Sequence, residues 1–438
     1  GFGGSVSALR LTEKGYKVLV LEKGMHLSAA DFPQSNWNLK RWLWLPSMRC
    51  FGLFKLTFFR HVSVLSGVGV GGGSLVYANT LPIPKKAFFT SPSWAHLADW
   101  ETELRVYYQT ALRMLGAATN PRLETGDLAL RELGRQIGME RHFEATEVSV
   151  FFGNPAETVP DPYFGGMGPA RAGCIFSGGC MTGCRHNAKN SLDKNYLYLA
   201  QQLGALIQAE SLATGVRPLG AADGADGYAV DWRPSATRKG AGGTIRCRGA
   251  VFAGGVLGTV ELLLLLKQTS LPRLSDRLGY GVRTNSEALI PVTVPDGKSV
   301  FSDGVAIGSI LHTDDNSHLE PVRYAAGSGF WRLGMGPRIF HPNVFMRLLK
   351  LAGDWLAHPL MNLKVLLVDD WAKRTQVLLF MQTIDSTLLM VRGRFGLATR
   401  LDVGPAPTAF MPEARDMSER YAAIVGGKPV ALVSETLF

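Results

Sequence analysis

Glycines and one acidic residue at the start of the chain have the types and spacing that could bind a dinucleotide. Gly1, Gly3 and Gly4 precede apolar residues at helical spacing, and an apolar run at 18–21 ends at Glu22. Glycines at a helix N-terminus let backbone N–H groups approach a diphosphate, and a carboxylate at a strand end accepts hydrogen bonds from ribose hydroxyls. Residues 1–24 therefore predict the second half of a dinucleotide-binding βαβ unit, with an ordinary helix–strand unit as the alternative. The first strand and first glycine of that fingerprint would precede Gly1, so we expect the chain to be a fragment.

Two later glycine-rich segments fit the same interpretation. Five glycines lie within residues 67–73 and have apolar flanks, which favours a loop that contacts a cofactor over a flexible linker. Residues 251–254 predict an apolar strand that ends in glycine and passes into a helix over 260–267. Such a joint places backbone against a ligand at the end of a parallel sheet, although a plain connection between two elements is equally compatible with it.

A third candidate for chemistry is a short segment with three cysteines. Cys174, Ser177, Cys180 and Cys184 occupy the four positions of a ferredoxin spacing, but one of them is serine and no proline follows the last. Three thiolates with the nearby His186 are a possible zinc site. Because one ligand of the cluster is missing, we favour a turn packed against the cofactor domain and predict no metal.

Composition limits the class of protein. The 438 residues suffice for two domains, and five cysteines are too few for a disulfide scaffold. The formal net charge of +10 could reflect a nucleic-acid partner, an anionic membrane surface or simply a soluble basic protein, and it also suits a bound diphosphate. The absence of a run of five basic residues makes nucleic acid the weakest of these interpretations. No apolar run reaches the ~18 residues of a membrane span. We expect a cytoplasmic or membrane-peripheral protein.

The hydrophobic pattern of the rest of the chain predicts the helices and strands that position the candidate site residues. Helices are expected over 94–115, 126–138 and 193–203, and strands over 205–209, 228–232 and 244–251. Beyond residue 300, alternating patterns predict antiparallel strands, with adjacent strands over 375–382 and 386–391. The basic amphipathic segment 344–356 predicts a surface helix in preference to membrane docking. The aromatic segment 25–62 is either a loop or lid that touches a membrane or guards an apolar substrate, or a set of aromatic residues packed between two domains. Packing is favoured.

The order of four segments resembles a known family. Residues 1–24, 67–79, 174–192 and 251–289 are similar to segments of the glucose–methanol–choline (GMC) oxidoreductases, in particular of the cholesterol-oxidase-like branch. The similarity is good up to about residue 310 and weaker beyond it. Tyr77-Ala78 stands where many members have Asn-Gly, and Ser177 stands where relatives often have a fourth cysteine.

This resemblance implies a flavoenzyme that uses FAD and oxidises an alcohol, with a sterol as one candidate. Gly1, Gly3 and Gly4 would hold the pyrophosphate and Glu22 the adenosine ribose. Gly71, Gly72, Gly73 and Ser74 would lie along the diphosphate and flavin, Ala253 and Gly254 would approach the adenosine, and Asn285 would lie near the edge of the cofactor domain.

The fold that it implies is α/β, with a discontinuous Rossmann-like FAD-binding domain and an α+β substrate domain built on an antiparallel sheet. The FAD-binding domain would comprise residues 1–90 and 171–300, the cap or substrate region 91–170, and the substrate domain 301–438.

The implied reaction has two parts: a base removes the alcohol proton, and hydride passes to flavin N5. Oxygen or another acceptor then reoxidises the flavin. The family's catalytic histidine lies in a C-terminal segment, whereas this chain has no histidine after Gly393. We therefore assign no catalytic residue and expect an incomplete enzyme. A Rossmann flavoprotein with an iron–sulfur centre and a non-catalytic, membrane-associated binding protein are the alternatives.

Overall fold

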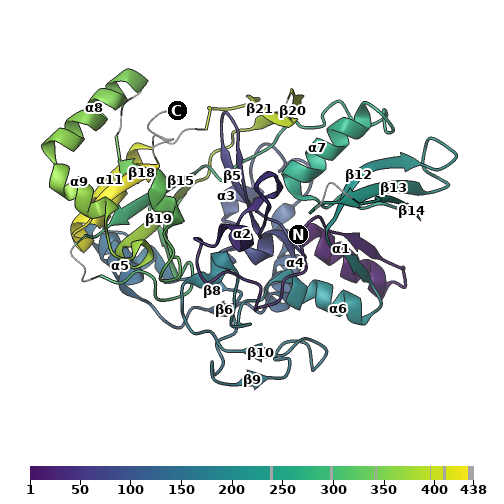
Figure 1. Cartoon of the computed structure of the whole chain (residues 1–438), viewed down its shortest axis with the longest axis horizontal. Coiled ribbons are helices and arrows are strands. Elements are labelled where there is room, and N and C mark those ends of the chain that lie inside the picture. The colour runs from purple at the N-terminus through teal and green to yellow at the C-terminus, as the bar shows by residue number, and fades with distance from the viewer. Residues whose placement is uncertain are drawn as a thin grey trace.

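The structure of the chain is a computed structural model. It describes residues 1–236, 240–295, 299–339, 341, 343–394, 396–407 and 411–432. Residues 433–438, at the end of the predicted substrate domain, lie outside the described residues. Figure 1 shows a large sheet with α5, α9 and α11 on one side of the molecule and α1, α6, α7 and a smaller sheet on the other.

The large sheet is antiparallel and has seven strands. Its order is β18 (Met335–Pro337), β22 (Lys428–Leu432), β15 (Glu287–Thr293), β19 (Thr375–Gln382), β17 (Ser317–Val322), β16 (Ser309–His312) and β7 (Phe143–Ala145). This confirms the antiparallel sheet expected beyond residue 300. Strands β7 and β15 come from earlier in the chain, so the sheet joins three of the four predicted segments; the domain boundaries stay a prediction.

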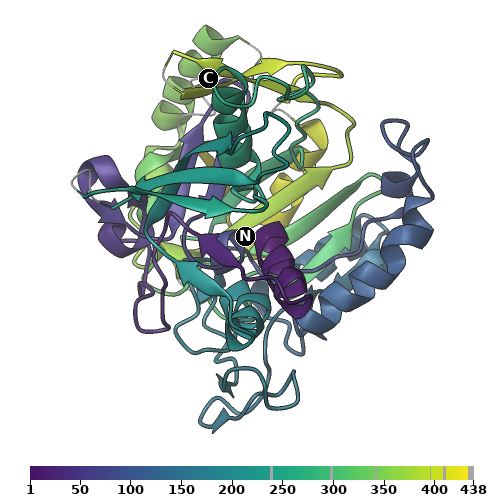
Figure 2. The same ribbon diagram turned by 90° about the vertical axis from the view of Figure 1, so that its right-hand side faces the viewer.

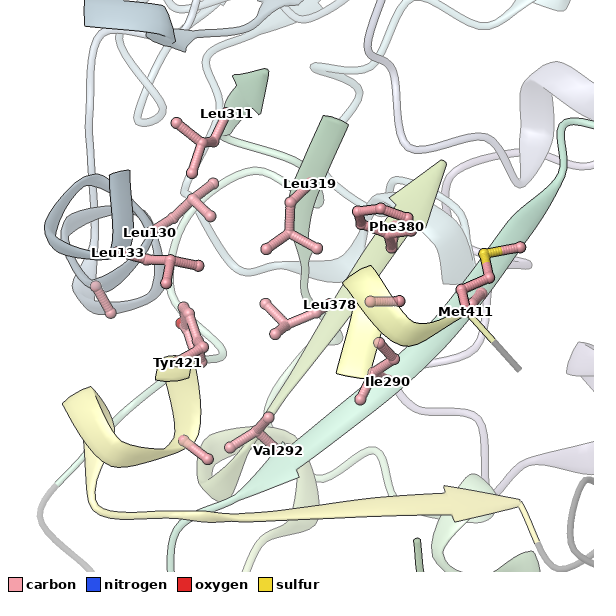
Figure 3. Close-up of a cluster of buried hydrophobic side chains, with 14 residues drawn as sticks. Leu130, Leu133, Ile290, Val292, Leu311, Leu319, Leu378, Phe380, Met411 and Tyr421 are labelled. Carbon is pink, nitrogen blue, oxygen red and sulfur yellow. The ribbon is translucent and has the colours of Figure 1, made fainter. Parts of the chain in front are cut away.

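One face of this sheet forms the main core. Helices α5 (Thr125–Gln136) and α11 (Pro412–Val425) cover it, and Leu130 and Tyr421 pack there against Ile290 and Phe380 (Figure 3). Because side chains alternate along a strand, Leu289 and Leu379 point to the opposite face. One face of the sheet therefore packs in the main core. The opposite face, with Leu289 and Leu379, is available to line a site, and we call it the free face.

The N-terminal segment folds as its pattern predicts. Helix α1 (Phe2–Glu13) has Gly1 as its N-cap, and β1 (Leu19–Leu21) follows it. Strand β1 pairs in parallel with β11 (Leu206–Gln208), while α1 packs on α6 (Tyr196–Gln202) through buried residues that include Leu9 and Leu197. The glycine turn, helix and strand are thus confirmed as elements; a complete Rossmann-like domain stays a prediction.

A smaller antiparallel sheet follows, formed by β12 (Ser211–Pro218), β13 (Tyr228–Pro234) and β14 (Gly243–Cys247). Helix α7 (Gly255–Lys267) comes next, and Figure 2 shows these strands beside α1. The strand predicted to lead into this helix is absent from the described structure: β14 ends at Cys247, and residues 251–253 pair with no neighbouring strand there. Residues 251–253 therefore form an irregular connection.

The C-terminal half corrects a second prediction. Strand β19 has β15 and β17 as its two neighbours, so no edge is free for residues 386–391. These residues contribute instead to β20 (Leu388–Gly393), which pairs with β21 (Gly396–Leu401). Helices α8 (Val344–Ala357) and α9 (Pro359–Leu366) precede them and include the expected surface helix. Across the described ranges, every helix is too short or too polar to cross a membrane.

The aromatic segment 25–62 is packed at its centre and exposed at its periphery. Trp42 is fully buried, stacks on Phe54 at 5.1 Å between ring centroids, and contacts Phe330 and Trp331. Packing against a distant segment is thereby confirmed for Trp42, whereas Phe58 is 72% exposed. The other elements are β2 (Trp44–Leu45), β3 (Cys50–Phe51), β4 (Phe54–Phe58), β5 (Ser63–Gly67), β6 (Ala118–Thr119), β8 (Glu147–Val148), β9 (Thr158–Val159), β10 (Arg171–Ala172), α2 (Leu39–Trp42), α3 (Lys86–Phe89), α4 (Trp100–Met114) and α10 (Trp371–Arg374).

Candidate active site

A cleft of about 3080 Å³ lies between the N-terminal elements and the free face of the large sheet. The structure brings most of the predicted cofactor residues to its wall: Gly1, Gly4, Glu22, Gly71, Gly72, Gly73, Ala253, Gly254 and Asn285. Gly3 and Ser74 are not among the lining residues. The buried Ser74 hydroxyl donates to the Gly71 carbonyl and accepts from the Leu192 N–H, both at 2.9 Å, so it holds the loop in shape.

The three glycine segments meet at this wall through their backbones. A Cβ atom at Gly72 would lie 2.6 Å from Cα of Gly1, and one at Gly4 would lie 2.9 Å from Cβ of Ala253. Gly72 also has a φ of 58°, which other residues rarely adopt. Glycine is therefore required here by both conformation and space.

Glu22 links the first glycine segment to the second. Its Oε1 accepts hydrogen bonds from the N–H groups of Gly24 at 2.7 Å and Gly69 at 3.3 Å. A Cβ atom at Gly24 would lie only 2.4 Å from the Gly69 nitrogen, so the close approach of the two loops depends on glycine. The carboxylate is thus fixed at the end of β1, beside the cleft.

These residues fit a dinucleotide cofactor such as FAD. Around a Cβ atom added at Gly1 or Gly73 there is no atom within 4 Å, and both residues line the cleft. A ligand could therefore reach their backbone. Apart from Gly3 and Ser74, the positions predicted to contact FAD line the cleft and are consistent with that role, which stays a prediction for each residue.

Lys189 is a site residue that the sequence analysis missed. Its Nζ donates to the carbonyl oxygens of Leu75 at 3.0 Å, Tyr77 at 2.8 Å and Cys180 at 2.8 Å, and only 2% of the residue is exposed. Burial lowers the pKa of Lys189 to about 7. The lysine ties the end of the glycine loop to the cysteine-rich turn, and Tyr77 and Met181 of these two segments line the cleft.

The cysteine-rich turn has no arrangement typical of a metal centre within the described residues. There, no three or more His, Cys, Asp or Glu side chains form a group that could hold an ion. Cys174, Cys180 and Cys184 are free, and burial raises the pKa of the Cys180 thiol. The carbonyl of Cys180 accepts from Lys189, which is consistent with the expected structural turn.

The opposite wall is the free face of the large sheet. It is lined by apolar and aromatic residues: Leu289, Val322, Tyr324, Trp331, Trp371, Val377 and Leu379. Ala78, after the glycine loop, and Met181 pack against the same cluster. The loop that is expected to contact the cofactor and the sheet face are therefore in direct contact.

Glu320 is the chemically unusual residue of this face. It is 1% exposed and does not itself line the cleft, but it is paired in register with Leu379, which does. Within the described structure its Oε2 has no hydrogen-bond partner, and its Oε1 lies 3.8 Å from Nε2 of His318. Burial, with a further contribution from Glu287, raises the pKa of Glu320 to about 8. Such a carboxyl group beside a cleft is typical of a functional site.

His318, the histidine beside Glu320, adds no positive charge there at pH 7. Burial lowers the pKa of His318 to about 4, with His312 and Lys85 adding to the effect, so His318 is neutral at pH 7. Glu287 lines the cleft and accepts a hydrogen bond from the side chain of Asn285. Asn285 thus lies where the predicted cofactor wall meets the acidic part of the sheet face.

Comparisons with known proteins agree with this geometry. No protein-family model matches the chain. A cholesterol oxidase of Acinetobacter baumannii is 41% identical over 456 residues, which cover 100% of this chain and 81% of that protein. A cholesterol oxidase of Mycobacterium tuberculosis (strain CDC 1551 / Oshkosh) is 39% identical over 454 residues, which cover 98% of this chain and 76% of that protein.

The fold, the cleft and these similarities define an oxidoreductase that acts on an alcohol. The chain belongs to the family of these cholesterol oxidases. This assignment favours an enzyme over the alternative of a non-catalytic binding protein.

Proposed function

We propose that the chain is a GMC-type enzyme that binds FAD in the cleft and oxidises the hydroxyl group of a sterol. The single observation that carries the proposal is the meeting of two walls in one cleft. One wall is glycine backbone suited to a diphosphate, and the other is an apolar sheet face with the buried Glu320 beside its lining residue Leu379. The names of the relatives at 41% and 39% identity support the sterol as substrate class.

The cofactor would be held by the first wall. Backbone N–H groups at the start of α1 and in the loop 71–73 would bind the diphosphate, and Glu22 would accept hydrogen bonds from a ribose. Bound FAD would supply the acceptor for the hydride that leaves the alcohol carbon. The contacts of Lys189 would hold the Tyr77 segment in place beside it.

The substrate would lie against the second wall. Leu289, Tyr324, Trp371 and Leu379 offer a continuous apolar surface. Burial of apolar area stabilises binding by roughly 25 cal/mol per Å², so a rigid fused-ring alcohol gains more there than a short polar alcohol does. The hydroxyl group would be directed toward Glu320.

Glu320 would act as the proton acceptor. A base is most effective when its pKa lies near the working pH, and Glu320 meets this condition with a pKa of about 8. The ionised carboxylate would take the hydroxyl proton, and the neutral carboxylic acid that results is the form favoured by its apolar surroundings. Molecular oxygen is the proposed final electron acceptor, as the oxidase names of the relatives imply.

The test combines a spectrum with an assay. The purified protein, reconstituted with FAD, is expected to show flavin absorbance without the broad absorbance of an iron–sulfur centre. The proposed role of Glu320 replaces the expectation of an incomplete enzyme, so with detergent-solubilised cholesterol the protein is expected to release hydrogen peroxide. With a short primary alcohol at the same concentration it is expected to release much less. Absence of bound flavin, or equal rates on both alcohols, would contradict the proposal.

A further inference from the structure

Helices α8 and α9 present apolar side chains to solvent. Eight of them, together with Leu367 directly after α9, are between 38% and 84% exposed: Phe345, Met346, Leu348, Leu349, Leu356, Leu360, Met361, Leu363 and Leu367. We call these nine residues the α8–α9 surface. Single exposed leucines are common on proteins, but a set this dense on two consecutive helices is typical of an interaction site.

Some polar residues of the same helices are buried, although Lys350 and Lys364 are exposed. Arg347 and Asn362 are each 3% exposed. Asp354 accepts hydrogen bonds from Lys428 at 3.0 Å and from Asn362 at 2.8 Å. These contacts anchor the inner side of the two helices and leave the nine apolar side chains exposed, which is unusual on a protein surface.

Helix α5 of the same molecule shows the usual arrangement. Its Leu130 and Leu133 are fully buried, and Arg131 and Arg135 are on its outer side. Helices α8 and α9 therefore expose apolar side chains that α5 buries. An interaction partner for these side chains would account for the difference.

We propose that the α8–α9 surface docks this protein on an anionic lipid bilayer. The apolar side chains would enter the boundary between headgroups and acyl chains, as those of amphipathic interfacial helices do. Charge complementarity favours a bilayer over a second copy of the chain: Lys350 and Lys364 are exposed beside the leucines, and the protein carries a net charge of +10. The nearby exposed anion, Asp369, is already paired with Arg374.

The position of the helices relates the surface to the cleft. Met335 and Arg338 line the cleft, and α8 begins at Val344, a short distance along the chain. Strand β18 contacts both helices. Docking would thus place one wall of the cleft close to the bilayer; this consequence rests on the proposed sterol substrate, whereas the docking itself does not.

The experiment measures sedimentation of the FAD-reconstituted protein with sterol-free vesicles. One set contains phosphatidylcholine alone and the other also contains phosphatidylglycerol. The test variant carries Phe345→Gln, Leu349→Gln, Leu356→Gln and Leu360→Gln. The control variant carries four equally polar changes at residues of similar exposure elsewhere, Leu97→Gln, Tyr107→Gln, Met167→Gln and Leu206→Gln.

The expected result is binding of the unaltered protein to anionic vesicles, a loss of at least about tenfold in the test variant, and no loss in the control. A second variant, Lys350→Gln with Lys364→Gln, is expected to weaken binding to anionic vesicles by about fivefold per lysine and to leave neutral vesicles unaffected. Circular dichroism and turnover of a detergent-solubilised alcohol check that each variant is folded.

Three outcomes would overturn the proposal. The unaltered protein does not bind anionic vesicles, the test variant binds as well as the control, or the test variant changes the oligomeric state without changing vesicle binding. The last outcome would make this surface an interface between copies of the chain. Because the vesicles contain no sterol, failure here is distinguishable from failure to oxidise solubilised cholesterol.

Discussion

The two walls of the cleft differ in which part of the chain forms their surface. The N-terminal wall is mostly backbone, and its glycines are there because a Cβ atom would collide with a neighbouring segment or fill the cleft. The wall on the large sheet is mostly side chains, held by seven strands whose other face is packed against α5 and α11. The N-terminal wall depends on the absence of side chains, and the sheet wall depends on the side chains that it presents.

This difference predicts opposite sensitivities to mutation. Added atoms are expected to damage the glycine wall, because its function depends on close approach of backbone. Removal of a functional group is expected to damage the sheet wall, because the proton acceptor that we propose there, Glu320, is a single carboxyl group. Changes at each wall can therefore separate binding from catalysis.

The largest effect is expected for Glu320→Gln. The amide keeps the size of the side chain but cannot accept a proton, so kcat/KM for the alcohol should fall by about 10²–10⁴-fold. For the unaltered enzyme, kcat/KM should rise with pH through about 8 as Glu320 ionises, and this limb should be absent from the variant. Steady-state kinetics between pH 6 and 10 measure both.

The control for this prediction is Glu157→Gln, at an exposed residue away from the cleft. It should retain the rate and the pH profile of the unaltered enzyme. If Glu320→Gln reduces the rate but keeps the same pH dependence, Glu320 is not the proton acceptor.

The next effect concerns Gly72→Ala and its neighbour Gly73→Ala. At Gly72, the positive φ and the 2.6 Å approach to Gly1 should destabilise the fold by about 2–4 kcal/mol. At Gly73 the added methyl group meets no atom within 4 Å, so the fold should be unaffected while FAD binds more weakly. Thermal melts and FAD titrations of the two variants distinguish the effects; equal melts would contradict the geometry.

How much the sequence reveals also differs between the two walls. The glycine wall is local in sequence: helix α1, the end of β1 at Glu22 and the loop near Gly72 follow from residue type and spacing within a few positions. What the sequence does not show is that Ser74 turns inward, or that Lys189 binds the carbonyls of Leu75 and Tyr77 from more than a hundred residues away.

The sheet wall depends on pairings between distant segments. The alternating pattern predicts β19, but its partners β15 and β17 lie far away in the chain, and the expected pairing with residues 386–391 is wrong. Glu320 looks like an ordinary strand residue until its burial beside Leu379 is known. Similarly, the pattern of α8 predicts an amphipathic helix without revealing which side faces outward.

Glu22→Ala is expected to have a smaller effect, mainly on binding of the cofactor. A hydrogen bond to a charged acceptor contributes about 1.5–3 kcal/mol, so FAD should bind roughly 10- to 150-fold more weakly. Because Oε1 also accepts from Gly24 and Gly69, a modest fall in thermal stability should accompany it. Isothermal titration with FAD measures the affinity, and an unchanged dissociation constant would rule out the ribose role.

The smallest effect is a pH-dependent gain in stability for Glu320→Gln. In the folded chain the pKa of Glu320 is about 8, whereas the ordinary glutamate value is 4.5. Between these pH values the unfolded chain has released this proton and the folded chain still holds it, so Glu320 makes stability fall as pH rises from about 4.5 to 8. The glutamine variant lacks this loss.

The stability difference between the two proteins should therefore grow across that window and be constant above it. We expect a gain of about 1–2 kcal/mol for the variant at pH 8, because relaxation and water penetration reduce the full cost of a buried charge. Urea unfolding of both proteins at pH 5 and pH 8, with Glu157→Gln as the control, measures the difference. If the variant gains the same stability at both pH values, Glu320 is ionised throughout this range. The sheet wall would then hold a fixed negative charge, and Glu320 would not be a proton acceptor with a pKa near neutral pH.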